Sequence, residues 1–497
     1  MIKAGIIMNK TIVGRKEELL LLKKAFNSIK AEFIAVYGRR RVGKTYLVHQ
    51  FFLKEKCLLF HVTGKYQENM QAQLDVFMQS ITKTFFENMG LEFKSSTNWM
   101  GAFELLTNNI EKFARKSKKV VLFFDELPWL ATKRSGFLAA LDYYWNTVWS
   151  KNRKIILIVC GSAASWMIKN IINSKGGLHN RITIEIPLYP FTLKESQDFL
   201  EYLGFKLNQH QILNLYMAFG GVPHYLEKIQ KELSVIQNIS KLYFTRGGSL
   251  QAEFEKLFSS LFDNAPAYVE LINMIAMKRE GVLRSSLDKN TKLSDSGGTL
   301  TERLEALERA GFVRSFIPLG HTDKGLYYKV IDEYCLFYLN WVKPVVKQLK
   351  DEVDLSYWQA KVNTAAWKSW SGYAFESICR KHLSQIKKAL YIPPDALSGS
   401  WKYIPRQYSK EKGAQIDLLF DRSDGAISIC EIKYSEKPFL IDKSYAENLS
   451  NKINAYREQT RTKKQIILSM ITANDIKKSA YSEKMVMGVV TLDDLFK

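Results

Sequence analysis

The stretch EFIAVYGRRRVGKTYLVHQFF, residues 32–52, decides the fold of the first part of this 497-residue chain. Glu32–Tyr37 is a short apolar run of strand length, and TYLVHQFF at the other end has the apolar spacing of a helix. The loop between them, GRRRVGKT (Gly38–Thr45), has the glycine, lysine and threonine spacing of a phosphate-binding loop. Strand, glycine-rich loop and helix in this order predict a parallel α/β sheet with a nucleotide site.

The chemistry of such a loop explains why these residue types are needed. Consecutive backbone N–H groups point at phosphate oxygens, and the N-terminus of the following helix adds its positive dipole end. We expect Lys44 to reach the β- and γ-phosphates of ATP and the Thr45 hydroxyl to bind Mg²⁺. The alternative is a glycine turn without a ligand. The residues predicted to bind nucleotide here are Gly38, Arg39, Arg40, Arg41, Val42, Gly43, Lys44 and Thr45.

A second apolar run, KVVLFFDE (Lys119–Glu126), ends in two acids. A continuous apolar run is typical of a central parallel strand, because helices bury both of its faces. Acids at the carboxyl end of such a strand lie where ligands bind in open α/β sheets. We therefore expect Asp125 to hold Mg²⁺ through water and Glu126 to polarise the water that attacks ATP.

A third apolar strand is predicted at Ile155–Cys160, and Gly161 and Ser162 follow it directly. A small polar side chain at this end of the sheet is placed to sense the γ-phosphate. The alternative is that Ser162 only caps the helix that comes next.

These motifs resemble the archaeal-type ATPase family, a branch of the AAA+-like P-loop ATPases. The resemblance implies ATP and Mg²⁺ as cofactors and places Val13 and Arg15 beside the adenine. The segment GGLHNR (Gly176–Arg181) resembles an arginine-bearing element of the family, although His179 and Asn180 stand where Tyr-Gly is usual. The motifs occur in family order: IVGRKEEL (Ile12–Leu19), the phosphate-binding loop, FDELPWL (Phe124–Leu130), CGSAASWM (Cys160–Met167) and FGGVPHYL (Phe219–Leu226).

The arginine of that element, Arg181, has two interpretations. It is an arginine finger, acting on a neighbouring subunit of a homo-oligomer, or an ordinary salt-bridging arginine. We predict that the ATPase core with its helical lid covers residues 11–235.

Residues 236–350 resemble a winged helix. Helical patterns at Tyr268–Lys278 and Thr299–Ala310, with a short helix beginning at Ser285, precede two strand-like runs, Phe312–Pro318 and Leu326–Ile331. The loop GHTDKG between the two runs would form the wing. Acidic residues mix with the basic ones, so DNA contact and packing within the protein both stay open. The basic residues near the third helix are Lys289, Lys292, Arg303 and Arg309.

After the aromatic segment Tyr334–Pro344 and the acidic linker Asp351–Asp354, residues 355–497 contain a helix pattern at Ser369–Leu383 that carries Glu376. Two strands follow, QIDLLFD (Gln415–Asp421) and ISICEIK (Ile427–Lys433), joined by a turn typical of a hairpin.

Ionisable residues interrupt these strands. Asp417 on the first strand and Glu431 and Lys433 on the second follow the pattern of PD-(D/E)xK nucleases, in which carboxylates bind Mg²⁺ and the lysine orients a water. Glu376 would be a further metal ligand. The alternative is a structural salt bridge from Lys433 to Glu431 or Asp417. This region also resembles the C-terminal domain of unknown function that follows the archaeal-type ATPase module.

The composition supports a folded, basic protein. Lysine and arginine number 72 against 50 acids, a formal net charge of +22, and every part of the chain is positive. Such a charge attracts polyanions, DNA above all, although a lysine-rich genome also produces basic surfaces. No apolar run approaches the length of a membrane span, and no secretory signal is visible. Five scattered cysteines predict buried thiols in a reducing cytoplasm.

The sequence thus predicts a multidomain α/β protein: a P-loop parallel-sheet ATPase core with a helical lid, a winged-helix middle domain and a restriction-endonuclease-like C-terminal domain. We expect ATP to control the action of the last two domains on DNA. The alternative is a nucleotide-gated switch that binds DNA or a protein partner without cutting.

Overall fold

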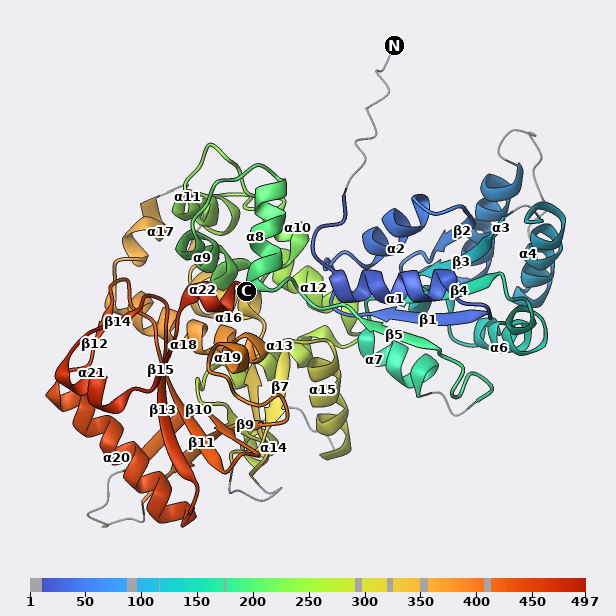
Figure 1. Ribbon diagram of the computed structural model, residues 1–497. Coiled ribbons are helices and arrows are strands. Elements are labelled where there is room, and N and C mark those ends of the chain that lie inside the picture. The colour runs from blue at the N-terminus through green and yellow to red at the C-terminus, as the bar shows by residue number, and fades with distance from the viewer. Residues whose placement is uncertain are drawn as a thin grey trace. The chain divides into compact units, whose positions relative to one another are not determined.

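The computed structural model describes residues 11–86, 96–115, 117–173, 176–290, 297–319, 325–348, 356–405 and 413–497. The chain forms two compact units (Figure 1). The first comprises the residues up to Pro190 with Glu305–Gly311, and the second comprises Phe191–Leu304 and Phe312–Lys497. Residues 191–235, the last part of the predicted ATPase core with its helical lid, therefore group with the second unit. The three domain ranges derived from the sequence stay predictions.

A five-stranded parallel sheet organises the first unit, as the sequence predicts. The strand β4 lies between β1 and β3, so the loops after these three strands open at one edge of the sheet. The strands, in spatial order, are β2 (Cys57–Thr63), β3 (Lys119–Asp125), β4 (Ile155–Gly161), β1 (Glu32–Tyr37) and β5 (Ile184–Pro187).

Helices bury both faces of this sheet, which explains its continuous apolar strands. Alternate residues of β3 join different cores: Val121 and Phe123 pack with α1 and α2, and Leu122 and Phe124 pack with α3, α4 and α6. The helices are α1 (Lys16–Asn27), α2 (Lys44–Leu53), α3 (Met70–Phe86), α4 (Trp99–Phe113), α5 (Leu127–Leu130), α6 (Phe137–Thr147) and α7 (Ala164–Met167), with helical turns at Trp149–Lys151 and Ile168–Ile172.

The first part of the second unit is helical and ends in a small antiparallel sheet of order β6-β8-β7. Helices and strands occur where the middle part of the sequence predicts them; the winged-helix assignment stays a prediction. The elements are α8 (Leu193–Tyr202), α9 (Gln209–Phe219), α10 (Pro223–Leu226), α11 (Val235–Ile239), a turn at Ser240–Phe244, α12 (Glu253–Leu261), α13 (Ala265–Ala276), β6 (Val282–Leu283), α14 (Arg284–Asn290), α15 (Gly297–Arg309), β7 (Val313–Phe316) and β8 (Tyr327–Val330).

The rest of the second unit contains a mixed sheet of order β15-β13-β11-β10-β9 (Figure 1). Strands β9, β10 and β11 are antiparallel neighbours, and β13 and β15 run parallel to β11. The helix α20 covers one face of this sheet and closes an apolar core against it. The predicted hairpin is present as β10 and β11.

The helices are α16 (Glu333–Phe337), which continues as a turn over Tyr338–Val342, α17 (Ser356–Lys361), α18 (Ala365–Lys381), α19 (Leu383–Ala389), α20 (Lys443–Thr460), α21 (Ala480–Met485) and α22 (Leu492–Leu495). The strands are β9 (Leu397–Tyr403), β10 (Ala414–Asp421), β11 (Ala426–Lys433), β12 (Phe439–Leu440), β13 (Gln465–Thr472), β14 (Ile476–Lys477) and β15 (Gly488–Val490).

Some predicted features lie outside the described residues: the N-terminal ten residues, most of the wing loop, Lys292 and the acidic linker Asp351–Asp354, together with the side chain of Lys289. Over the ranges that are described, no helix is both long enough and apolar enough to cross a membrane. All five cysteines are free thiols, and four of them are buried.

Candidate functional site

The phosphate-binding loop adopts a conformation that ordinary residues resist. Gly38 has φ 145° and Gly43 has φ 93°, and Arg41 between them is also left-handed at φ 72°. A Cβ on Gly38 would meet the main-chain oxygen of Leu188 closer than van der Waals contact allows. Glycine is therefore required at position 38 both by the backbone conformation and by the close approach of a second chain segment.

Lys44 lies at the start of α2 and turns its side chain back into the loop. Its buried ammonium donates hydrogen bonds to the main-chain oxygens of Gly38 (2.9 Å) and Arg39 (3.0 Å). The loop thus brings a positive charge to the place where its backbone closes. This arrangement suits an anion that enters the loop and takes over the ammonium from the carbonyl oxygens.

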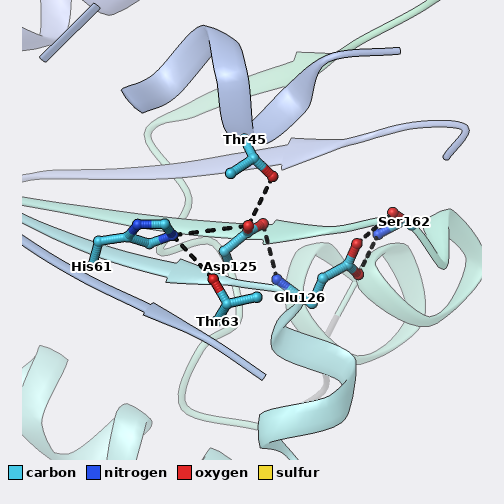
Figure 2. Close-up of polar contacts among 6 residues, drawn as sticks. All are labelled: Thr45, His61, Thr63, Asp125, Glu126 and Ser162. Carbon is cyan, nitrogen blue, oxygen red and sulfur yellow. Dashed lines mark hydrogen bonds and ion pairs between the residues drawn. The ribbon is translucent and has the colours of Figure 1, made fainter. Parts of the chain in front are cut away.

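The side chain of Thr45, in the first turn of α2, contacts that of Asp125, at the end of β3 (Figure 2). The Thr45 hydroxyl donates to Oδ2 of Asp125 at 2.7 Å, although 80 residues separate them in the sequence. Asp125 is only 3% exposed. Burial would raise its pKa, but hydrogen bonds from His61, Thr45 and Cys160 outweigh burial and hold the pKa below its ordinary value. Asp125 is therefore ionised at neutral pH, with its carboxylate oxygens facing the loop.

Glu126 and Ser162 form the next contact along this edge of the sheet (Figure 2). The Ser162 hydroxyl donates to Oε1 of Glu126 at 2.7 Å, and the Ser162 N–H donates to Oε2 at 3.2 Å. Glu126 itself adopts a left-handed backbone conformation, with φ 47° and ψ 49°. Strained backbone of this kind gathers at functional sites, because the surrounding structure must hold it in place.

Two polar residues of this site, His61 and Thr63, escape prediction from the sequence. They end β2, whose carboxyl end adjoins that of β3 (Figure 2). His61 Nε2 lies 3.2 Å from the Thr63 hydroxyl and 3.9 Å from Oδ2 of Asp125, and its ring stacks on Phe123. The run CLLFHVT (Cys57–Thr63), in which apolar residues are followed by polar ones, is a strand signal that was not among the predictions.

The remaining predicted nucleotide residues occupy different positions. Arg15 is buried and donates to the main-chain oxygen of Val42 at 3.1 Å, so the segment that contains Val13 runs beside the loop. Arg40 is half-buried within the loop. Arg181 is solvent-exposed and donates to the main-chain oxygen of Gly177 at 3.4 Å. The structure shows no contact between Arg181 and the Asp125 cluster.

The oxygen donors at this edge of the sheet fit Mg²⁺. Thr45 and Asp125 supply a hydroxyl and an ionised carboxylate that already lie within hydrogen-bond distance of each other. Magnesium prefers hard oxygen ligands and is held by few protein groups, with water and phosphate completing its coordination. These two side chains would hold the ion beside the loop.

A second cluster of ionisable side chains lies in the second unit. Glu376 on α18 comes together with Asp417 on β10 and with Glu431 and Lys433 on β11. Burial, followed by the charge of Asp417, raises the pKa of Glu376 to about 7. The charge of Lys433 acts on Glu376 in the opposite direction. The structure therefore brings all four predicted residues to one site.

Glu431 is the most enclosed member of this cluster, only 2% exposed. Lys452 donates to both of its carboxylate oxygens at 3.0 and 2.8 Å, the Tyr445 hydroxyl donates at 2.6 Å, and Lys433 lies at 3.2 Å. Burial would raise its pKa, but the two lysines outweigh burial and lower the pKa of Glu431. Lys433 thus makes the salt bridge that was the structural alternative.

Four residues of this second cluster were missed by sequence reasoning. Tyr445 and Lys452 lie seven residues apart on α20, a spacing that places them on one helix face. Arg380 of α18 donates to the main-chain oxygen of Asp417, and Lys329 of β8 faces Glu376 and Asp417. The helix spacing was a usable signal, whereas Lys329 comes from another part of the fold and only the tertiary structure reveals it.

The second cluster does not fit a metal ion in this arrangement. Within the described parts of the chain, no three His, Cys, Asp or Glu side chains gather closely enough to hold one. The oxygens of Glu431 face the ammonium groups of Lys433 and Lys452, which take the place a cation would need.

Comparison with known proteins identifies an ATPase domain in this chain. Residues 12–229 match the model of a family described as an ATPase domain predominantly from Archaea. An uncharacterized ATP-binding protein of Methanocaldococcus jannaschii is 31% identical over 258 residues, which cover 44% of this chain and 70% of that protein. An uncharacterized protein of the same archaeon is 24% identical over 433 residues, 85% of this chain and 88% of its own length.

A Walker-type ATPase of Pyrococcus abyssi is similar in structure, with a TM-score of 0.47 and 19% identity over 66% of this chain and 96% of that chain. The match of the family model to residues 12–229, together with the extent to which the chain covers its 31%-identical relative, establishes its relationship. The chain belongs to the family whose ATPase domain occurs predominantly in Archaea.

Proposed function

We propose that the first unit binds ATP and hydrolyses it. The observation that carries the proposal is the Thr45–Asp125 contact directly beside the phosphate-binding loop, with Glu126 next along the chain. This is the set that nucleotide hydrolysis requires: a cradle for phosphates, oxygen ligands for a metal, and a carboxylate for the attacking water. The similarity to an ATP-binding relative supports the same conclusion.

In this proposal each residue of the site has a separate role. Lys44 exchanges the main-chain oxygens of the loop for the β- and γ-phosphates of ATP. Thr45 and Asp125 would hold Mg²⁺, which would neutralise charge on the phosphates. Glu126 polarises the attacking water while the hydrogen bonds from Ser162 hold its carboxylate in position. Val13 and Arg15 are proposed to lie beside the adenine, and exposed Arg181 to reach a neighbouring subunit of a homo-oligomer.

The test compares variants of the loop and of the proposed base in the full chain. Lys44→Ala is expected to weaken binding of a fluorescent ATP analogue at least tenfold, and Glu126→Gln to retain binding but lower phosphate release about a hundredfold. Lys56→Ala, an exposed lysine beyond α2, is the matched control. Undiminished nucleotide binding by Lys44→Ala would refute the proposal.

We further propose that the second unit acts on DNA under the control of the ATPase. The net charge of +22 and the cluster of Glu376, Asp417, Glu431 and Lys433 support this role. The salt bridges that close Glu431 favour binding of DNA without cutting, as a nucleotide-gated switch would bind it. A protein partner in place of DNA is an outcome that the test below can reveal.

Metal-dependent cleavage is the second candidate, supported by the ion pair of Lys433 with Glu431 and by the charges of Asp417 and Lys433 that act on Glu376. Glu376, Asp417 and Glu431 would be the metal ligands and Lys433 the residue that orients water. This candidate requires Lys452 to leave Glu431, because its ammonium group contacts both carboxylate oxygens.

One experiment separates these candidates. Plasmid and single-stranded DNA are incubated with Mg²⁺ or Mn²⁺, with and without ATP, using the wild type, Lys44→Ala and Glu431→Ala. The switch predicts DNA binding that ATP alters, without cleavage in any variant. Cleavage that Glu431→Ala abolishes and Lys44→Ala alters would establish a nuclease controlled by nucleotide. Absence of DNA binding even at low salt would overturn both candidates and direct the search to protein partners.

A further inference from the structure

Lys329 enters the second cluster from a strand outside the nuclease-like sheet. Side chains alternate along β8, so Tyr328 and Val330 face one way and Lys329 the other. Lys329 is only 8% exposed, and its ammonium lies over the ring of Tyr373 on α18, 4.6 Å from the ring centroid. The small sheet β6-β8-β7 thus delivers a buried positive charge to the surface of α18.

The face of α18 under this ammonium carries the cluster. Tyr373, Glu376 and Arg380 follow one another at intervals of three and four residues, so they share one helix face. A group above Tyr373 therefore neighbours Glu376 and Arg380, and the Arg380 guanidinium contacts the main-chain oxygen of Asp417. The charges that act on Lys329 come from these same residues, Arg380, Glu376 and Asp417, and from Glu280.

The position of Lys329 is fixed by contacts between the small sheet and the rest of the second unit. The Leu319 N–H, just after β7, donates to the main-chain oxygen of Ser400 on β9 at 2.9 Å. Arg279, just before β6, donates to the Ser369 hydroxyl on α18 at 2.7 Å. These two hydrogen bonds, one beside β7 and one beside β6, hold the small sheet on the nuclease-like elements.

Within the described ranges, the Tyr373 ring contacts the Lys329 ammonium, but no hydrogen bond or salt bridge of this group is present. In the part of the chain that the structure describes, no carboxylate oxygen lies within ion-pair distance of this ammonium, although Glu376 and Asp417 are its neighbours. The other lysines of the cluster, Lys433 and Lys452, are both engaged by Glu431. A buried ammonium without a hydrogen-bond acceptor is costly, so its retention points to an acceptor supplied by a ligand.

We propose that Lys329 binds a phosphodiester group of a DNA strand that enters the cluster. β8 is then a wall of this site, and the small sheet serves the nuclease-like elements and does not act as a separate DNA-binding wing. An ammonium is a compact charge with three donors, which suits the oxygens of a phosphate. The inference rests on the proposed action of the second unit on DNA.

The experiment measures binding of a fluorescein-labelled single-stranded DNA of about 20 nucleotides to the full chain by anisotropy, without metal, between about 50 and 200 mM salt. Lys329→Met keeps the length of the buried stem and removes the charge, and we expect it to weaken binding about tenfold. The slope of log affinity against log salt should fall by about 0.7, the value for one phosphate contact to a single strand. Lys329→Arg should retain both.

Two further variants keep the test decisive. Lys368→Met removes an exposed lysine from the same helix, α18, and should change neither affinity nor slope. Lys329→Gln also removes the charge but keeps a polar side chain. It replaces Lys329→Met in the test if methionine impairs folding, and it should weaken DNA binding to the same extent. A wild-type affinity and slope in the folded Lys329→Met or Lys329→Gln variant would overturn the inference alone. Failure of the wild type to bind DNA at the lowest salt would overturn the proposed function instead.

Discussion

At the scale of single residues, Glu126 shows how strain and function coincide. Its left-handed backbone, at φ 47°, costs an ordinary residue about 1–2 kcal/mol. The hydrogen bonds from Ser162 to both carboxylate oxygens help to offset this free energy, and they also hold the carboxylate of the proposed base in place. The second site uses the same device, because Lys452 holds both oxygens of Glu431. In each site hydrogen bonds hold a carboxylate in a defined position.

Ser162→Ala tests the restraint on Glu126. Removing the hydroxyl leaves Oε1 of Glu126 without its 2.7 Å bond, so the carboxylate loses its defined position. We expect kcat for ATP hydrolysis to fall about tenfold or more while KM for ATP changes less than twofold, because Ser162 positions the base and does not hold the nucleotide. Steady-state phosphate release measures both constants.

Ser162→Thr is the matched variant for this prediction, because it keeps the hydroxyl donor. It should restore most of the lost kcat. An equal rise of KM in both variants, with kcat unchanged, would show that Ser162 contributes to binding and would contradict a positioning role.

At the scale of elements, the phosphate-binding loop depends on contact with a segment distant in sequence. Gly38 follows β1, and its Cα packs against the backbone of Leu188, directly after β5. The two strands are parallel neighbours in the sheet, so their carboxyl ends approach each other closely. The loop conformation is therefore set by the sheet as well as by its own glycines.

Gly38→Ala tests this dependence. The added methyl group would collide with a backbone oxygen that cannot rotate away, at a φ that L-residues rarely adopt. We expect a loss of about 2–3 kcal/mol in unfolding free energy and a loss of ATP-analogue binding. Gly372→Ala on α18 is the control: nothing lies near its added methyl group, so helix propensity should stabilise the protein by about 0.5–1 kcal/mol. Urea unfolding and nucleotide titration of both variants provide the comparison.

At the scale of the whole molecule, the second unit joins segments that the sequence suggested as separate domains. His382 at the end of α18 is 1% exposed and accepts a hydrogen bond from the N–H of Leu193 on α8, 189 residues away. Its other ring nitrogen donates to the main-chain oxygen of Ile378 at 2.8 Å. A neutral imidazole therefore links α8 to the end of α18.

This contact predicts a loss of stability in mild acid. Burial lowers the pKa of His382 to about 4, against an ordinary value of 6.5, so the unfolded chain binds a proton that the folded one refuses. Stability from this group is present above pH 6.5 and declines as the pH falls towards 4. It should decrease by about 2 kcal/mol between pH 7 and pH 5. His382→Gln, whose amide can both donate and accept, should lose correspondingly less in urea unfolding at the two pH values; an equal loss would contradict the assignment.

Much of the first site was predictable from the sequence, because its determinants are local. The spacing of Gly38–Thr45, the acids after Lys119–Phe124 and the serine after Ile155–Cys160 each follow a continuous apolar strand, and parallel strands present their carboxyl ends at one edge. His61 and Thr63 escaped prediction because the strand before them was not recognised.

The second site was predictable only in part. Glu376, Asp417, Glu431 and Lys433 could be named from strand alternation and helix position, since hairpin pairing follows from a local turn. Whether their charges are free was not predictable: Lys452 and Tyr445 approach from α20 only when that helix packs on the sheet.

The sequence by itself thus determined a parallel-sheet ATPase unit with a phosphate-binding loop, and it predicted a cluster of nuclease-type residues. Periodicity and motif spacing record these features within short windows of the chain. The tertiary structure alone decided the closure of Glu431 by Lys452, the delivery of Lys329 from β8 and the link from His382 to Leu193. Each is a contact between elements far apart in sequence, and no local pattern specifies which buried charge will face which partner.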